Sequence, residues 1–143
     1  MNTNLRVLKY GGSSLDSIEK IKSIAKNIAD EYKNGDRFIL VVSAMGKTTD
    51  ELTNLAQKIT SQPHQREMDM LLTAGERVSM ALMSLALNDL VIPAISFTGS
   101  QAGIMTCGTH GDAQILEVKP IRVVDELKKE KVIVLAGFQG VDP

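Results

Sequence analysis

The stretch FILVVSAMGKTTD, residues 38–50, decides the fold. Its first part, Phe38–Val42, is entirely apolar, which is typical of a strand buried on both faces of a parallel sheet. Small and hydroxyl residues follow, and an amphipathic helical pattern then runs from about Asp50 to Thr60. A buried strand that leads through a short loop into a helix indicates an α/β layered fold.

The same alternation continues on both sides of this stretch. The sequence predicts further strands over Leu5–Tyr10, Ile92–Phe97 and Val132–Ala136, an edge strand over Gln114–Val118, and helices over residues 16–33, 66–87 and 121–130. Asp16 and Glu19 fit a capping box at the start of the first helix, and Asn34-Gly35 marks its end. Residues 99–111 read as a loop that can hold a short hairpin. We therefore expect a three-layer α/β sandwich with a mainly parallel central sheet, in which residues 1–143 form one domain or an incomplete piece of a larger one.

Composition excludes several classes of function. The 16 basic and 17 acidic residues give a formal net charge of −1, so charge offers no case for nucleic acid or an anionic membrane as partner. Cys107 is the single cysteine and cannot form an intramolecular disulfide. The residues from Met1 to Lys9 hold no secretory apolar run, and the apolar stretch Val78–Leu87 is too short to span a bilayer. A cytoplasmic protein is expected.

The first candidate site is KYGGSS, Lys9–Ser14, which follows the first predicted strand. Two glycines allow backbone N–H groups to approach an anion, a helix N-terminus follows, and Lys9 supplies a full positive charge. The spacing is not that of a Walker A loop. The residues alone leave two interpretations open: a phosphate-binding loop, or a tight turn with an exposed lysine.

Two further segments carry candidate ligand-binding side chains. Ser43 and Thr49 follow the buried strand and can donate hydrogen bonds at the ligand-binding edge, although Thr49 or Asp50 can equally cap the next helix. Glu76 lies among apolar residues, where a carboxylate needs a partner. That partner is either the ammonium group of an amino-acid substrate or the neighbouring Arg77. Gly75, inside a helical pattern, indicates close packing or a bend.

No metal site is expected. His64 and His110 are the only histidines, and neither they nor Cys107 stand in a cluster with ligand spacing. No serine, histidine and aspartate combination suggests a catalytic triad. A last strand-to-loop segment of small residues, Ser96–Gly103, completes the set of candidate loops.

Taken together and in order, five segments resemble the aspartokinase branch of the amino-acid kinase family. They are KYGGSS at 9–14, VSAMGKTTD at 42–50, LTAGERVS at 72–79, SFTGSQAG at 96–103 and AGFQG at 136–140. The first segment alone is also similar to loops in kinases of acetylglutamate, carbamate and uridylate. The later segments are more specific, and the resemblance covers essentially the whole chain.

The resemblance implies transfer of the ATP γ-phosphoryl group to the side-chain carboxylate of L-aspartate, with Mg²⁺, as the first step toward lysine, threonine and methionine. Lys9, Gly11 and Gly12 would hold the transferring group, and Thr49 and Glu76 would hold the aspartate. The residues implied at ATP and its phosphates are Lys9, Tyr10, Gly11, Gly12, Ser13 and Ser43. A homo-oligomer is expected, with Val78–Leu87 as a candidate interface.

Two features depart from the family pattern. Asp112 and Gln114 stand where the family more often has Asn and Arg. The family's Gly-Arg-Gly-Gly-Ser-Asp segment, expected after Pro143, is missing, so we expect a truncated kinase domain with little or no activity of its own. The alternatives are another amino-acid kinase, such as one acting on acetylglutamate, and a non-catalytic binding module built from half a kinase.

Overall fold

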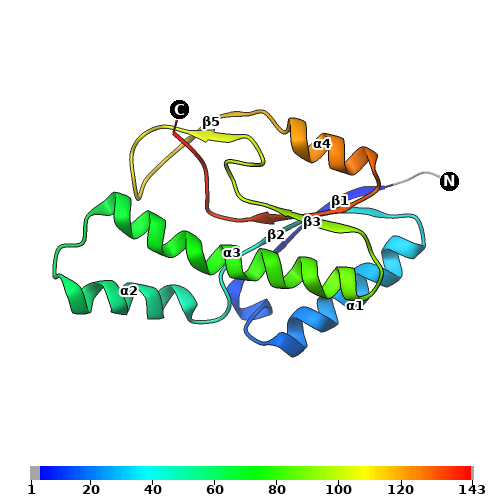
Figure 1. The fold of residues 1–143 in the computed structure, drawn as a ribbon, viewed down its shortest axis with the longest axis horizontal. Helices are drawn as coiled ribbons and strands as arrows, with labels where there is room; N and C mark the ends of the chain where they lie inside the picture. The colour runs from blue at the N-terminus through cyan, green and yellow to red at the C-terminus, as the bar shows by residue number, and fades with distance from the viewer. Residues whose placement is uncertain (1–3, 143) are drawn as a thin grey trace.

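The computed structural model describes residues 4–142 (Figure 1). Met1–Thr3, within the stretch predicted to lack a secretory leader, and Pro143, the last residue of the predicted domain, lie outside the described residues. The central sheet has four parallel strands in the order β1-β2-β6-β3. Their bounds are β1 Leu5–Tyr10, β2 Arg37–Val42, β6 Val132–Ala136 and β3 Ala94–Phe97. The mainly parallel sheet predicted from the sequence is confirmed.

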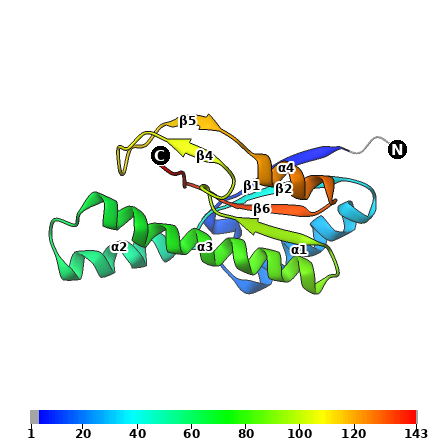
Figure 2. The ribbon, with the colours of Figure 1, turned by 45° about the horizontal axis from the view of Figure 1, so that its top comes forward.

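Helices cover both faces of the sheet, which gives the three predicted layers (Figures 1 and 2). Helices α1 (Ile18–Lys33) and α3 (Gln65–Asp89) pack on one face, and α4 (Ile121–Lys128) packs on the other. Alternate residues of β2 explain this arrangement. Phe38, Leu40 and Val42 belong to the larger core beneath α1 and α3, whereas Ile39 packs in the smaller core beneath α4.

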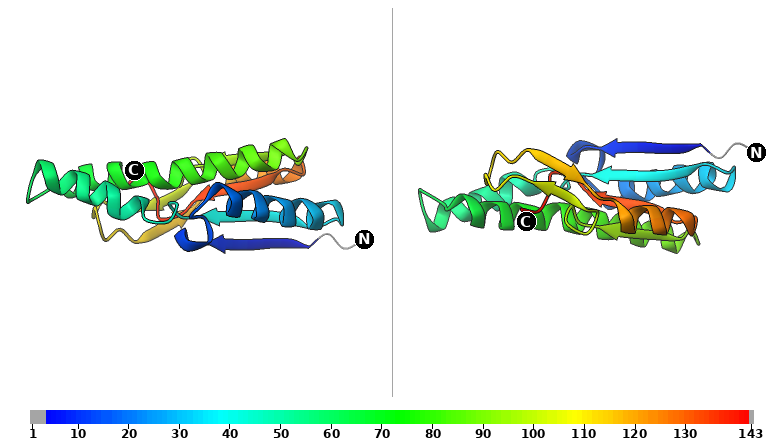
Figure 3. Two further views of the ribbon diagram at one scale, coloured as in Figure 1. Left: turned by 90° about the horizontal axis from the view of Figure 1, so that it is seen from below. Right: turned by 90° about the horizontal axis from the view of Figure 1, so that it is seen from above.

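Helix α3 is the longest helix among the described residues, with 25 residues. It runs beside α2 (Thr48–Ile59), and the two extend past the end of the sheet (Figures 1 and 3). By length and composition α3 could cross a membrane, with a mean hydropathy of 1.3 over its most apolar window. Its inward residues, including Met83 and Leu87, lie in the larger core, so here α3 is the central helix of a folded domain.

Several predictions about where elements begin and how they pair are corrected. The cap of α1 is Ser17, whose hydroxyl accepts a hydrogen bond from the Lys20 N–H, and Asp16 instead pairs with the Lys20 ammonium group. Strand β3 begins at Ala94 rather than Ile92, because Pro93 has no N–H to offer the ladder. The predicted edge strand is β5 (Ile115–Val118), which pairs antiparallel with β4 (Ile104–Thr106) in a hairpin separate from the central sheet.

Candidate active site

The loops that carry the predicted site residues meet at the carboxyl edge of the sheet, where backbone hydrogen bonds join them. The Ser43 N–H donates to the Tyr10 carbonyl oxygen at 3.1 Å, and the Gly46 N–H donates to the Gly12 carbonyl oxygen at 2.9 Å. The Gly137 N–H donates to the Val42 carbonyl oxygen at 2.8 Å. The segments after β1, β2 and β6 therefore form one connected surface, as expected for a ligand site in a parallel sheet.

The Lys9–Ser14 loop combines an exposed lysine with a close backbone contact. Lys9 and Gly11 are exposed, and a β-carbon built on Gly11 would meet nothing within 4 Å. A β-carbon on Gly12 would lie 2.9 Å from the Ala44 carbonyl oxygen, so Gly12 must lack a side chain for the two loops to touch. The Tyr10 ring packs against the larger core, where burial raises the pKa of its hydroxyl.

The helix N-terminus expected after the glycines is that of a single 3₁₀ turn, Gly12–Ser14, and α1 begins at Ile18, two residues after the predicted start at Asp16. The carbonyl of Ser13 accepts a hydrogen bond from the Lys20 ammonium group at 3.0 Å, which ties this turn to α1. Any anion at the glycines would therefore meet the backbone of a short turn and not the N-terminus of α1.

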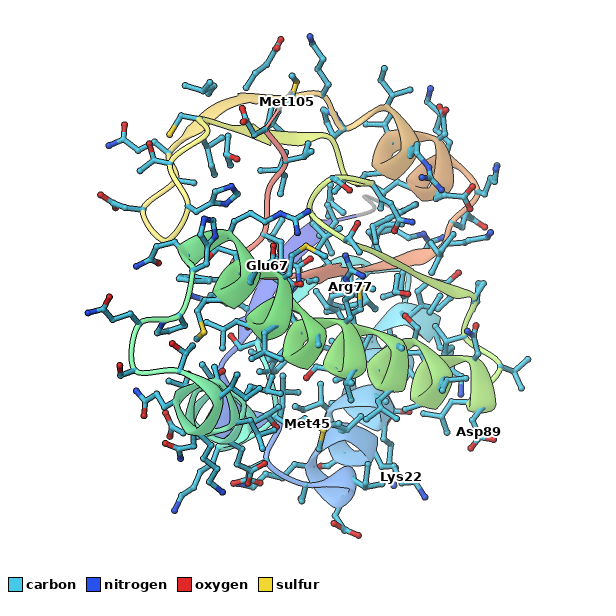
Figure 4. The ribbon with its side chains drawn as sticks, turned by 60° about the vertical axis from the view of Figure 1, so that its left-hand side comes forward. Lys22, Met45, Glu67, Arg77, Asp89 and Met105 are labelled. Carbon is cyan, nitrogen blue, oxygen red and sulfur yellow. The ribbon has the colours of Figure 1, made fainter. Side chains whose placement is uncertain are left out.

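The loop after β2 brings Ser43 and Ala44 to the edge, and α2 begins earlier than predicted, at Thr48. Ser43 is half-buried, and Thr49 is exposed in the first turn of α2. Lys47 holds the cap position without a side-chain hydrogen bond, so the alternative in which Thr49 or Asp50 caps this helix is wrong. Met45, labelled in Figure 4, packs against the larger core and so attaches the loop to the core.

Gly75 of helix α3 packs against the loop after β2, so the next residue, Glu76, also lies beside that loop. A β-carbon on Gly75 would lie 2.8 Å from the Ala44 β-carbon, so the predicted close packing is confirmed. Glu76 is only 8% exposed. Burial raises the pKa of its carboxyl group, while the N–H groups of Glu76 itself and Ala44 act in the opposite direction. No ion pair joins Glu76 to Arg77, which is exposed, so that alternative is wrong for the described residues.

Glu76 lines a cavity of about 570 Å³, bounded by α3, the end of β6 and the β4–β5 hairpin. Other lining residues include Val41, Thr73, Leu135 and Gln139. The Gln139 side-chain amide donates to the Thr73 carbonyl oxygen at 3.1 Å, which fixes the segment after β6 against α3. The cavity thus offers a small ligand the buried Glu76 carboxylate and neutral polar groups, and its lining also includes the charged residues Arg66, Asp69, Asp112 and Asp142.

The other predicted residues lie beside this cavity and not in its wall. Lys9 is in register with Val41 on the neighbouring strand, and paired residues of parallel strands point to the same face of a sheet. Lys9 therefore lies one strand away from the cavity wall, on its side of the sheet. Ser43 and Thr49 do not line the cavity, although the loop that carries them contacts Gly75 and Glu76. Lys9 therefore lies outside the cavity whose wall contains Glu76.

Several residues at the site were not predicted as site residues. Gln139 lies in the AGFQG segment, where a polar side chain directly after a buried strand was an available signal. Asp69 and His110 also line the cavity, but they are far apart in sequence and no spacing connects them. The Ser96–Gly103 segment reaches the same edge, because Gly99 packs directly against the Gln139 carbonyl group. Within residues 4–142, no three His, Cys, Asp or Glu side chains come together as a metal site.

Known proteins similar in sequence are aspartokinases. The chain is 52% identical to the aspartokinase of Mycolicibacterium smegmatis over 137 residues, which is 96% of this chain and 32% of that protein. It is 49% identical to the aspartokinase of Bacillus sp. strain MGA3 over 138 residues, again 96% of this chain and 34% of the relative. The chain thus spans about a third of the length of these curated relatives.

Solved structures give the same result for the fold. The crystal structure of aspartate kinase from Synechocystis matches with a TM-score of 0.81 and 48% identity, over 95% of this chain and 22% of that one. E. coli aspartokinase III, in complex with aspartate and ADP, matches with a TM-score of 0.78 and 17% identity, over 97% of this chain and 41% of that one. The family described as the Amino acid kinase family matches residues 4–143. On this match, and on the parallel sheet and edge site described above, the chain belongs to the amino acid kinase family.

Proposed function

We propose that the protein to which this chain belongs transfers the γ-phosphoryl group of ATP to the side-chain carboxylate of L-aspartate. The observation that carries the proposal is Glu76, a carboxylate buried at the wall of a small cavity next to the edge of the sheet. The names of the relatives support the same substrate, and one similar structure is described as a complex with aspartate and ADP. Because the chain spans about a third of those relatives, the reaction is proposed for the whole protein.

Glu76 is suited to bind the ammonium group of the substrate. Burial raises the pKa of its carboxyl group because the ionised form lacks solvent. A cationic group placed against it would supply the missing counter-charge and so gain more than it would at an exposed carboxylate. The same argument disfavours a substrate whose amine is acylated, because such a ligand brings no positive charge to Glu76.

The loop after β1 is suited to hold the phosphoryl group. An oxygen of the aspartate side-chain carboxylate attacks the γ-phosphorus, the bond from that phosphorus to the bridging oxygen breaks, and ADP leaves with the electron pair. The products are ADP and 4-phospho-L-aspartate. Phosphoryl transfer depends mainly on positioning and on stabilising spread negative charge. Lys9 would supply positive charge, the backbone at Tyr10–Ser13 and the Ser43 hydroxyl would supply hydrogen bonds, and Thr49 would contact the aspartate.

Mg²⁺ would bind at this site as a complex with ATP. The described residues form no group of three carboxylate, histidine or cysteine ligands, so they do not fit a site built wholly from protein side chains. Mg²⁺ commonly keeps several waters and binds through nucleotide phosphates and one or two carboxylates. We propose further that the protein is a cytoplasmic homo-oligomer, acts on neither nucleic acid nor membranes, and supplies lysine, threonine and methionine synthesis.

An amide NMR titration of the chain with L-aspartate tests the substrate, with N-acetyl-L-glutamate as the matched control ligand. Shifts centred on Glu76 and Gln139 are expected for L-aspartate alone. The variant Glu76→Gln keeps the shape of the side chain and should lose these shifts. Glu67→Gln makes the same change on an exposed residue of α3 and should keep them. Equal binding of both ligands, or unchanged binding of L-aspartate by Glu76→Gln, would contradict the proposal.

A further inference from the structure

The connection between β4 and β5 reaches the N-terminal end of α3 (Figures 1 and 4), and its residues line the outer part of the cavity. We call residues 107–114 the cover loop. Its ends are held together by hydrogen bonds from the Cys107 N–H to the Gln114 carbonyl oxygen, at 3.0 Å, and from the Gln114 N–H to the Cys107 sulfur, at 3.2 Å. The residues between Gly108 and Ala113 are exposed, so the loop has no apolar core of its own to fix it.

One carboxylate of α3 holds the middle of the cover loop. Asp69 Oδ2 accepts a hydrogen bond from the Gly111 N–H at 3.1 Å and lies 3.0 Å from His110 Nδ1, which donates to it when that nitrogen carries a proton. Gly111 has a φ of +79°, and a β-carbon there would lie 2.8 Å from Gln65 Oε1. The contact is with the flexible end of the Gln65 side chain, so it is the positive φ of Gly111 that disfavours a side chain at this point.

Asp69 and Glu76 lie on the same face of α3, seven residues apart. Seven residues are about two helical turns, so the two carboxylates are separated by about 10 Å along the helix axis. The cavity occupies the space between them. Glu76 is buried, whereas the side chain of Asp69 is 38% exposed. The cover loop is therefore attached at the outer end of the cavity and Glu76 lies at the inner end.

We propose that Asp69 is a latch: its carboxylate keeps the cover loop closed over the cavity and so positions the loop for ligand binding. Both contacts to the loop depend on this one side chain. Losing it would free the loop to move away from α3 and open the outer end of the cavity to solvent. The role in closing the cavity stands on geometry alone, while the effect on L-aspartate rests on the proposed function.

The latch is tested first without any ligand. Asp69→Ala should raise the hydrogen-exchange rate of the Gly111 amide by about tenfold or more, the loss expected for a hydrogen bond to a charged group. Asp69→Asn keeps one acceptor oxygen and should restore part of the protection. Asp89→Asn makes the same change on exposed Asp89 of α3 and should leave Gly111 unchanged. His110→Ala removes the second contact from the loop side and serves if the Asp69 variants do not fold.

Cys107 reports directly on opening, because it is the only thiol and lines the cavity. Its alkylation by iodoacetamide, measured across pH and extrapolated to the fully ionised thiolate, removes differences in the ionised fraction from the comparison. Asp69→Ala should speed this reaction, and Asp89→Asn should not. If Asp69→Ala speeds exchange at Gly111 but not the alkylation of Cys107, the Asp69 contact holds only the surface of the loop and the latch is overturned. Unchanged exchange at Gly111 would also overturn it.

Measuring L-aspartate binding then distinguishes a failure of the latch proposal from a failure of the proposed function. If the wild-type chain binds L-aspartate, Asp69→Ala should weaken the affinity by about tenfold, in step with the lost hydrogen bonds, and Asp69→Asn should recover part of it. An unchanged affinity would overturn the positioning role. If the wild-type chain binds no L-aspartate, the proposed substrate site of this chain fails, and exchange and alkylation still decide whether Asp69 closes the cavity.

Discussion

Replacing Gly75 by alanine places a methyl group at the contact between α3 and the loop after β2. The new β-carbon would lie 2.8 Å from the Ala44 β-carbon and 3.3 Å from Thr48 Cγ2. Carbon atoms pack best at about 3.5–4.0 Å, so the nearer contact is too short by about 0.7–1.2 Å. Overpacking of this kind costs about 1–3 kcal/mol. Alanine in place of glycine returns about 1 kcal/mol of helix propensity. The expected net loss of stability is about 0–2 kcal/mol.

A double-mutant cycle isolates the contact from the propensity. Ala44→Gly removes the methyl group that the side chain introduced by Gly75→Ala would contact too closely. The free energy of unfolding of the double variant should therefore exceed the value expected from adding the two single effects by about 1–2 kcal/mol. Ala74→Gly, at an exposed neighbour on the same helix, measures the propensity separately and should cost about 1 kcal/mol. Urea unfolding followed by circular dichroism gives each free energy of unfolding. If Gly75→Ala stabilises the chain and shows no coupling to Ala44→Gly, the close contact does not exist.

Four further substitutions test the site and the elements around it. Burial raises the pKa of the Glu76 carboxyl group above its ordinary value of 4.5. Ionised Glu76 therefore destabilises the folded state above the folded-state pKa, and this cost disappears as pH falls toward 4.5. Glu76→Gln removes the group that bears the cost. The variant should be more stable than wild type at pH 7, with an advantage that shrinks on acidification; an advantage that grows would contradict the sign. Gly12→Ala sets a β-carbon 2.9 Å from the Ala44 carbonyl oxygen and should cost about 1–3 kcal/mol in thermal or urea unfolding; a neutral effect would count against the loop contact. Ser17→Ala removes the cap of α1 and should cost about 1 kcal/mol, whereas Asp16→Ala, which removes only an exposed ion pair, should cost less.

The sequence predicts the sheet well because the strands carry their own signal. Phe38–Val42 is apolar throughout, and both faces of that strand are covered in the structure. Boundaries were less accurate where two residues could serve the same purpose. Asp16 and Ser17 are both good caps, and in the structure Ser17 caps α1 while Asp16 pairs with Lys20.

Some residues of the candidate site could likewise be predicted from the sequence, and others could not. Lys9, Gly12 and Glu76 stand out locally, as a charge after a strand, a glycine in a turn and an acid among apolar residues. The pairing of Asp69 with His110 and Gly111 joins residues more than 40 positions apart, and no period or motif connects them. The 3₁₀ turn at Gly12–Ser14, which precedes α1, was not predicted from the sequence.

The hydrogen bonds that join the loops at the edge of the sheet, from Ser43, Gly46 and Gly137, run from main chain to main chain. None of them requires a particular side chain beyond the space that glycine provides. Mutations that alter the side chains around this edge can therefore accumulate without dismantling the frame that holds them. A scaffold built in this way is tolerant of drift, and new ligand preferences can evolve by exchanging side chains while the backbone at this edge stays in place.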